Sequence, residues 1–241
     1  EENGLMGIEG VDTRMLTIKL REHGVMMAAL FTGSDDGHKA VRLAQNAPVQ
    51  ETRELIQDVT CKEAYHLPGS GKKIAVLDLG CRKSILQSLQ NRGADLYVYP
   101  YGTPADVILA DNPQALFLTN GPGYPFAAPK AVETVKNILG TIPVQGVCMG
   151  TEIIAAALGS EVEKLRLGHR GASQPVRFSD GSVAVTYQGH GYAVVGDSLP
   201  EGCEVSCINL NDHTVEGFVN NDLGIYCVPF HPEHEAVHDG A

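Results

Sequence analysis

The sequence predicts an α/β protein with a doubly wound, mostly parallel sheet and an antiparallel portion, preceded by the tail of a smaller α/β domain. Three observations support this class. From Lys72 onward, short apolar runs alternate with stretches of helical periodicity, as in a parallel sheet whose strands are joined by helices. After Gly159, short alternating stretches are separated by Gly, Asn and Asp, as between antiparallel strands. Residues 1–66 follow neither pattern for long.

The front of the chain begins with a predicted short helix. Asp12 is a favourable N-cap, residues 13–22 carry apolar side chains at helical spacing, and Gly24 stands where glycine commonly ends a helix. Residues 25–31 are apolar and predict a strand, whereas residues 32–37 are turn-forming and predict a tight reversal. A helix followed by a strand and a turn is what the tail of a small α/β domain would contribute.

A connector is predicted between this front segment and the main domain. Residues 44–71 are polar and mixed, with Pro48 and Pro68 among them. We therefore assign residues 1–66 to the tail of the smaller domain plus a linker, and residues 67–241 to the main domain. The chain starts without methionine and stops shortly after an apparent site motif, so we expect it to be a fragment.

The main domain shows a regular order of strands and helices. Residues 74–79 form a continuous apolar run, followed by Gly80 and a stretch with helical spacing, and the same rhythm recurs downstream. The predicted strands are 74–79, 95–99, 115–118 and 143–147, and the predicted helices are 82–91, 129–139 and 151–158. The predicted antiparallel stretches are 183–187, 193–195, 204–208 and 215–218, and a last buried strand is predicted at 225–228.

Charge and composition exclude several kinds of partner. A formal net charge of -11 creates a field that repels phosphate backbones, so we expect no binding to nucleic acid. No apolar run approaches the roughly 18 residues that a membrane helix needs, so we expect no membrane segment. The six cysteines have no paired CxxC spacing and no signal peptide precedes them, which favours a cytoplasmic location.

The sharpest local feature is Gly-Val-Cys-Met-Gly at residues 146–150, where an apolar strand stops and a helix starts. This is the form of a nucleophile elbow, in which glycines flank a residue with a strained backbone. The helix that follows points its amino end at Cys148, and the positive end of a helix dipole favours a thiolate. The alternative is that Cys148 is a small buried apolar residue, as many cysteines are.

A thiolate nucleophile requires a base and a group that orients the base. His-Pro-Glu at residues 231–233 follows the last predicted strand. Residues two apart on an extended segment project to the same side, so His231 and Glu233 can touch. With Cys148 they would form a Cys-His-Glu triad, in which the carboxylate fixes the imidazole tautomer. The alternative is an ordinary surface turn after a strand.

Acyl transfer also needs donors for a developing oxyanion. The backbone amide of Met149 is one candidate, because it lies at the amino end of the helix after Cys148. The loop 120–123, Asn-Gly-Pro-Gly, is the other, because glycines let backbone amides approach a substrate closely. Read alone, this loop is a simple turn.

Two further features are weaker. His234 and His238 are four residues apart, a spacing that can bind metal on a helix, but no third ligand is nearby in sequence, so we predict no metal site. Residues 69–72, Gly-Ser-Gly-Lys, end like a phosphate-binding loop but precede a strand instead of following one. We interpret them as part of the linker.

At residues 146–150 and 231–233 the sequence resembles the class I glutamine amidotransferases, whose marks are a Gly-x-Cys-x-Gly elbow and a late His-Pro-Glu. The resemblance implies a flavodoxin-like α/β fold and hydrolysis of glutamine. Residues 7–17 narrow it, because Gly-Ile-Glu-Gly-Val-Asp-Thr-Arg-Met-Leu-Thr is similar to a stretch of the small subunits of carbamoyl phosphate synthetases. Residues 168–176 and 190–194 resemble the same subunits.

This resemblance implies a reaction and a partner. Cys148 would attack glutamine, ammonia would leave, and water would hydrolyse the glutamyl thioester. The ammonia would pass to a large synthetase subunit that makes carbamoyl phosphate from bicarbonate and ATP, for pyrimidine and arginine biosynthesis. No cofactor is expected in this chain, because ATP and Mg would be bound by the partner large subunit.

The resemblance also implies a set of glutamine-binding residues and exposes three departures. The family usually has Gln in place of Glu152 and Asn in place of Gly189, and its small subunits begin with a fuller amino-terminal domain. A carboxylate at Glu152 would either repel the α-carboxylate of glutamine or attract its ammonium group. The implied substrate-binding residues are Gly121, Gly123, Met149, Glu152, Gly189, Gly191 and Tyr192.

Two other functions stay open at this stage. The departures at Glu152 and Gly189 and the short front would suit a non-catalytic, partner-binding subunit in which Cys148 is a remnant. The motifs alone would also suit another class I amidotransferase or a stand-alone γ-glutamyl hydrolase.

Overall fold

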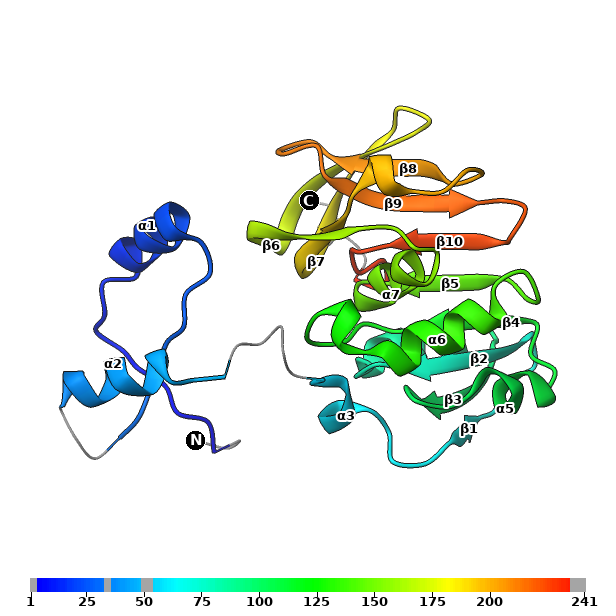
Figure 1. Cartoon of the computed structure of the whole chain (residues 1–241), viewed down its shortest axis with the longest axis horizontal. Helices are drawn as coiled ribbons and strands as arrows, with labels where there is room; N and C mark the ends of the chain where they lie inside the picture. Colours follow the sequence, from blue (N-terminus) through cyan, green and yellow to red (C-terminus); the bar gives the residue numbers. More distant parts are fainter. Residues whose placement is uncertain (1–3, 33–35, 49–53, 235–241) are drawn as a thin grey trace, which may run out of the picture. The chain divides into compact units, whose positions relative to one another are not determined.

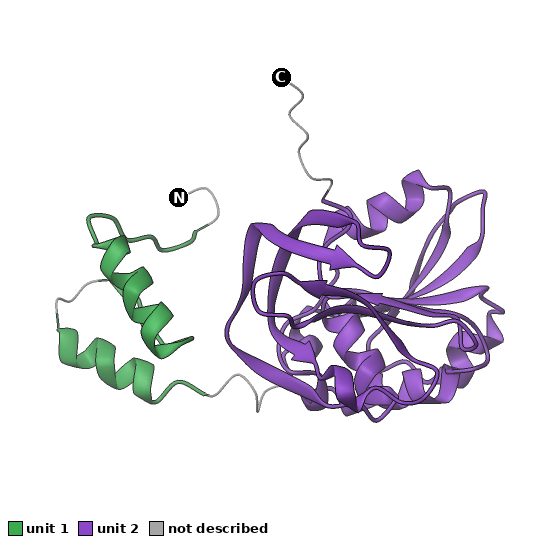
Figure 2. Cartoon of the chain, turned by 90° about the horizontal axis from the view of Figure 1, so that it is seen from above, with its two compact units in different colours: residues 1–50 green, residues 51–241 purple. Residues whose placement is uncertain are grey.

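The computed structural model describes residues 4–32, 36–48 and 54–234. The chain divides into two compact units, Glu1–Gln50 and Glu51–Ala241 (Figure 2), and each is described by itself. Within the described residues, no helix combines the length and the apolar character needed to cross a membrane.

The described residues of the first unit form two helices. The predicted helix is confirmed as α1, Thr13–His23: the Asp12 carboxylate accepts a hydrogen bond from the Met15 amide at 2.9 Å, and Gly24 ends the helix at φ 83°. A second helix, α2 (Gly37–Gln45), was not predicted. Its N-cap is Asp36, whose carboxylate accepts from the Lys39 amide at 3.1 Å. Aspartate before glycine suits a reversal and a helix start equally well, and here it starts a helix.

The predicted strand at residues 25–31 is wrong, because the described structure assigns no strand there. Val25, Met26 and Met27 are at least half exposed. A strand exists only when its backbone finds a pairing partner, and no described strand pairs with this segment. The predicted reversal at residues 32–37 falls partly on residues outside the described part.

The predicted connector packs onto the second unit. It forms α3 (Ile56–Val59) and β1 (Tyr65–Leu67); Ile56 is 1% exposed, and the Thr60 hydroxyl donates to the Asp78 carbonyl at 2.7 Å. The second compact unit therefore starts before the boundary that composition suggested at residues 66 and 67. As a division between two domains, that boundary stays a prediction.

One mixed sheet organises the second unit (Figure 1). Its strand order is β1-β3-β2-β4-β5-β10-β9-β8-β6-β7. The parallel strands are β2 (Lys73–Asp78), β3 (Asp95–Pro100), β4 (Ala115–Leu118), β5 (Val144–Val147) and β10 (Ile225–Val228). The strands that pair antiparallel are β1 at one edge and, beyond β10, β9 (Val215–Asn220), β8 (Glu204–Asn209), β6 (Val162–Phe178) and β7 (Val183–Val194).

Helices cover both faces of the parallel strands, as expected of a doubly wound sheet. Leu86 and Leu89 of α4 (Lys83–Asn91) pack against Val76, Leu96 and Val98 on one face. On the other face lies the larger core, to which three helices contribute: α5 (Ala105–Ala110), α6 (Pro129–Ile138) and α7 (Met149–Ala157). The described part of this unit also contains the short 3-10 turns η2 (Pro125–Ala127) and η3 (Gly196–Ser198).

The predicted fold class is confirmed, with a larger antiparallel portion than expected. Strands 115–118 and 225–228 have the predicted bounds. The stretch 183–187 and the first two residues of 193–195 prove to be parts of one strand, β7, which ends at Val194 and pairs along β6 with register shifts. The sequence missed α5, which is too short to show helical periodicity.

Candidate active site

The predicted site residues lie after the carboxyl ends of neighbouring parallel strands. Loop 120–123 follows β4, Cys148 follows β5, and His231 follows β10. These strands are adjacent in the sheet, in the order β4-β5-β10 (Figure 1). This edge is where open α/β sheets usually carry their sites.

The turn at Cys148 has the strained geometry of a nucleophile elbow. Cys148 has φ 51° and ψ -120°, a backbone conformation that residues other than glycine rarely adopt. A Cβ on Gly146 would lie 2.7 Å from the Gly150 carbonyl carbon, and a Cβ on Gly150 would lie 2.6 Å from the Leu118 carbonyl oxygen. Both positions must be glycine because the helix, the strand and the neighbouring strand approach one another so closely.

The surroundings of Cys148 favour a neutral thiol. Burial raises its pKa to about 12, and the negative charge of Glu152 adds to this effect. The backbone amides of Met149 and Gly121 and the charge of Arg82 act in the opposite direction. Because burial prevails, the sulfur can become a nucleophile at neutral pH only if a nearby base takes its proton.

His231 and Glu233 form a buried pair. His231 Nδ1 lies 2.9 Å from Glu233 Oε1, and the two side chains are 2% and 4% exposed. A carboxylate only accepts, so Nδ1–H donates and Nε2 is left as the basic nitrogen. Burial by itself would raise the pKa of Glu233, but the hydrogen bond from His231, a backbone amide and nearby histidine charges together lower it. Glu233 therefore stays ionised and holds the imidazole tautomer.

The register of the paired strands β5 and β10 determines where Cys148 and His231 lie along the sheet edge. Val147 pairs with Val228, and the Cys148 amide donates to the Val228 carbonyl at 3.0 Å, so the chain leaves both strands at the same level. No hydrogen bond joins the Cys148 sulfur to the His231 imidazole among the described residues. Catalytic hydrogen bonds are often long without substrate and shorten in the complex.

The two predicted oxyanion donors converge on Cys148. The backbone amides of Met149 and Gly121 both interact with its sulfur and lower its pKa. Gly121 reaches this place only because it has no side chain: a Cβ there would lie 2.3 Å from the Leu79 carbonyl oxygen. The next glycine of the loop, Gly123, has φ 102°, which also favours glycine.

Strand β7 borders the same site. The His231 amide donates to the Tyr187 carbonyl of β7 at 2.9 Å, and the ring centroids of Tyr192 and Tyr124 lie 5.1 Å apart. These contacts bring residues 187–192 beside His231 and beside the segment that follows loop 120–123. A Cβ on Gly189 would meet nothing within 4 Å, so the departure at Gly189 leaves open space at this strand.

With this geometry in place, comparison with known proteins decides the family. Residues 75–241 match the family described as glutamine amidotransferase class-I. The chain belongs to this family. The identification that residues 146–150 and 231–233 suggested is thereby confirmed.

Similar sequences carry a more specific name. A carbamoyl phosphate synthase small chain from Methanosarcina mazei is 47% identical over 98% of this chain and 67% of its own length. One from Archaeoglobus fulgidus is 43% identical over 94% of this chain and 64% of its own length. This amidotransferase chain is thus a member of the small-chain family and spans about two thirds of the length of these relatives.

Solved structures support the amidotransferase fold. A crystal structure described as a GMP synthase component from Thermoplasma acidophilum has a TM-score of 0.60 at 22% identity, covering 69% of this chain and 87% of that one. A glutamine amidotransferase from Thermotoga maritima has a TM-score of 0.55 at 15% identity, covering 68% and 77%. At these identities the likeness concerns the fold alone.

Arg82 lies at the candidate amidotransferase site, and sequence reasoning missed it. Its amide donates to the Asn120 side-chain oxygen at 2.9 Å, and its guanidinium carbon lies 5.6 Å from the centre of the Tyr187 ring. Its charge lowers the pKa of Cys148. The signal was present in the sequence, because Arg82 follows a predicted parallel strand and therefore belongs to the same sheet edge.

A buried polar network lies beneath the 187–192 segment. His169 Nε2 is 2.9 Å from Asp212 Oδ2, and His169 Nδ1 is 2.8 Å from Glu216 Oε1. Both ring nitrogens face carboxylate acceptors, so His169 is an imidazolium. Burial alone would lower its pKa, but hydrogen bonds and charge from Glu216 and Asp212 outweigh burial and raise it. Glu216 also accepts from the Gln188 side chain of β7 at 2.9 Å.

The same network has the residue types of a metal site. One nitrogen each of His169 and His190 and one oxygen of Glu216 lie within 4.8 Å of one another. However, the protonated His169 already places a positive charge between two carboxylates, and a metal ligand must be a neutral imidazole. We interpret the cluster as a hydrogen-bond network that supports β7.

The raised pKa of His169 predicts a pH dependence of stability. A group whose pKa is higher in the folded state stabilises fully below its unfolded pKa, near about 6.5, and loses this effect as pH rises through the folded value. In chemical denaturation, His169→Gln is expected to lower the free energy of unfolding by about 1–3 kcal/mol in mild acid and by less at alkaline pH. The exposed His66, paired with Asp95, provides the control His66→Gln. A pH-independent difference for His169→Gln would contradict the assignment of charge.

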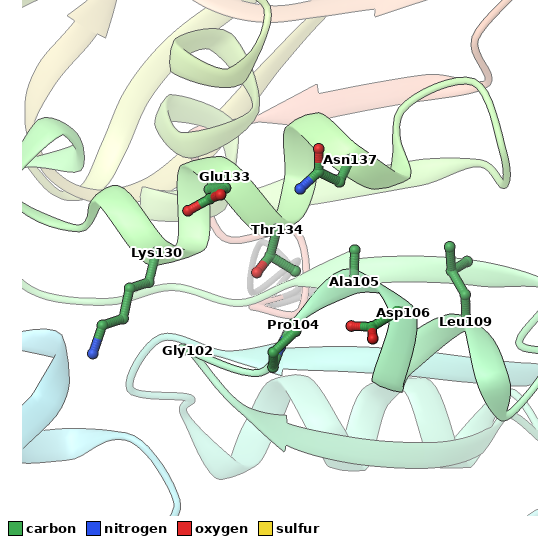
Figure 3. A pocket seen from close by; sticks show the side chains of 9 residues that line it. All are labelled: Gly102, Pro104, Ala105, Asp106, Leu109, Lys130, Glu133, Thr134 and Asn137. Carbon is green, nitrogen blue, oxygen red and sulfur yellow. The ribbon is translucent and has the colours of Figure 1, made fainter.

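A separate cleft of about 530 Å³ lies between α5 and α6 (Figure 3). Figure 3 shows Lys130 and Glu133 on α6, with Asp106 on α5 across the cleft. No residue of the predicted amidotransferase site lines it. The Thr134 hydroxyl on α6 donates a hydrogen bond to the Thr103 carbonyl, just before α5, at 2.9 Å, and this bond joins the two sides of the cleft. The cleft is therefore a feature of the packing of these two helices.

Proposed function

We propose that this chain is the glutamine-hydrolysing part of a carbamoyl phosphate synthase small subunit, which converts glutamine to glutamate and ammonia. One observation carries the proposal: a strained cysteine elbow and a buried, oriented His-Glu pair follow adjacent parallel strands in a chain that is 47% identical to a small chain. The reaction type follows from the elbow and the pair, and the assignment to this synthase follows from the relatives.

In the proposed mechanism, Cys148 is the nucleophile and His231 the base. The sulfur attacks the side-chain amide carbon of glutamine while its proton passes to Nε2 of His231. The amides of Met149 and Gly121 stabilise the negative charge on the amide oxygen. His231 then returns the proton to the leaving nitrogen, which departs as ammonia and leaves a thioester on Cys148. Water, deprotonated by His231, hydrolyses this thioester to glutamate and the free thiol.

Glutamine would lie between the loop after β4, the start of α7 and strand β7. The tilted pair of Tyr124 and Tyr192 would close one side of this space, and Arg82 would provide a cation at its mouth. The proposed contacts are Gly121, Gly123, Met149, Glu152, Gly189, Gly191 and Tyr192.

The proposal extends to a partner and a location. The large synthetase subunit would bind ATP and Mg and use the ammonia with bicarbonate to form carbamoyl phosphate for pyrimidine and arginine biosynthesis. The free cysteines Cys61, Cys81, Cys148, Cys203, Cys207 and Cys227 are consistent with a reducing cytoplasm.

The test is alkylation by a glutamine analogue that carries a chloroketone group. The proposal predicts that Cys148 alone is labelled at neutral pH, that glutamine protects it, and that labelling is faster when the large subunit is present. Buried Cys227 on β10 is the internal control, because it should stay unmodified. If Cys148 is not labelled in the complex, the non-catalytic, partner-binding subunit becomes the better interpretation.

A further inference from the structure

Glu152 is an unusual side chain for its position. It lies on the first turn of α7 and is 3% exposed, and among the described residues no hydrogen bond to its carboxyl group contributes to its pKa. Cys148 is the residue that caps this helix, so Glu152 lies within one turn of the helix end at which the sulfur stands. In its ionised form, Glu152 raises the pKa of the Cys148 thiol. A buried carboxyl group thus stands beside the nucleophile.

The neutral acid is the stable form of this group. An ionised carboxylate that is buried without a partner costs far more free energy than a neutral one. Burial is the cause that raises the pKa of Glu152, to about 8. The elements packed against α7 carry titratable groups, but none of them contributes to this shift. The titratable side chains on these elements are Lys130, Glu133 and Lys136 on α6, His190 and Tyr192 on β7, and Tyr226 and Cys227 on β10; β6 adds further charged side chains.

We propose that Glu152 works as a protonated carboxylic acid beside Cys148 and that loss of this proton makes Cys148 a weaker nucleophile. When Glu152 releases its proton to solvent, the new negative charge raises the free energy of the neighbouring thiolate. Less of the Cys148 proton is then transferred to His231, and attack on the substrate slows. Glu152 is in this sense a positioning residue that acts through Cys148 and sets an alkaline limit to the reaction. This inference deepens the proposed function and rests on it, because the identification of the reaction as glutamine hydrolysis comes from that proposal.

Protonation of Glu152 also decides whether this side chain would repel or attract the charged groups of glutamine. A neutral carboxylic acid neither repels the α-carboxylate of glutamine nor attracts the ammonium as an ion would. Like the side-chain amide of Gln, it offers a carbonyl oxygen that accepts hydrogen bonds and a polar hydrogen that donates one. The substitution of Glu for the usual Gln is therefore compatible with a working site below the pKa of Glu152.

The first experiment measures alkylation of Cys148 by iodoacetamide, which is neutral and carries no glutamine group. In the full chain, the rate for Glu152→Gln is expected to exceed that of the wild type by about tenfold above roughly pH 8, and to approach it below about pH 7, since one pKa unit is a factor of ten. Glu163→Gln, which removes an exposed carboxylate on β6, should follow the wild type at every pH. A constant ratio between Glu152→Gln and wild type across pH would indicate a merely structural effect and overturn the inference.

The second experiment observes the proton itself. The infrared carbonyl stretch of a protonated carboxyl should be present in the wild type at neutral pH, should vanish as pH rises through about 8, and should be absent from Glu152→Gln. Absence of the band in the wild type at neutral pH would overturn the inference. Both measurements are made without glutamine, so a failure of the glutamine analogue to label Cys148 tests the proposed function and leaves these results unaffected.

Discussion

Replacing Cys148 by serine is expected to abolish glutamine-dependent synthesis of carbamoyl phosphate by the complex, with a loss of at least about 10³-fold. The hydroxyl has nearly the shape of the thiol, so the elbow should fold, but it does not ionise in the conditions where His231 can accept a proton from sulfur. Ammonia-dependent synthesis should continue, because ammonia bypasses this site. The measurement compares initial rates with glutamine and with ammonium salt.

The matched control is Cys203→Ser, which changes a half-buried cysteine outside the site. It should leave both rates near those of the wild type. Loss of ammonia-dependent synthesis in Cys148→Ser would show that the substitution damages the complex, and retention of the glutamine-dependent rate would remove Cys148 as the nucleophile.

Replacing Gly150 by alanine is expected to destabilise the second unit by about 3 kcal/mol. In an ordinary helix, alanine in place of glycine stabilises by about 1 kcal/mol. Here the added Cβ would lie 2.6 Å from the Leu118 carbonyl oxygen and 2.7 Å from the Leu118 Cβ, so α7 must move away from β4. The clash exceeds the gain in helix propensity and displaces the Met149 amide. Denaturant unfolding of the wild type and the variant measures the difference.

The matched control for this prediction is Gly102→Ala in the same unit. A Cβ there would meet only the flexible Lys130 side chain, at 3.4 Å, so the change in the free energy of unfolding should be within about 1 kcal/mol. Equal stability of Gly150→Ala and wild type would show that α7 and β4 have room to separate and would contradict the close packing at the elbow.

Local sequence predicted much of the site because its elements are short-range. The elbow at residues 146–150 depends on two glycines around one residue, and the pairing of His231 with Glu233 depends on a spacing of two in an extended segment. Strand 225–228 was recognisable from four apolar residues bounded by turn formers. In each case the physical cause lies within a few residues of the chain.

Other features depend on partners that are distant in sequence. The apolar segment 25–31 forms no strand because pairing requires a neighbour, and α2 arises where Asp36 caps a helix instead of turning the chain. The position of Arg82 after a predicted strand was visible in the sequence, but its contacts are with Tyr187 and His234, more than a hundred positions later in the printed sequence. Sequence spacing contains no direct information about such contacts.

The sequence by itself determined the residue types of the proposed nucleophile, base and orienting carboxylate, and the strand-to-helix turn that carries the sulfur. Tertiary structure alone decided which groups surround them and in which state of protonation. Strand order brings the Gly121 amide and the Arg82 charge to Cys148, and burial keeps protons on Cys148 and Glu152. Solvation and through-space charge depend on the packed environment, and that environment exists only once the chain has folded.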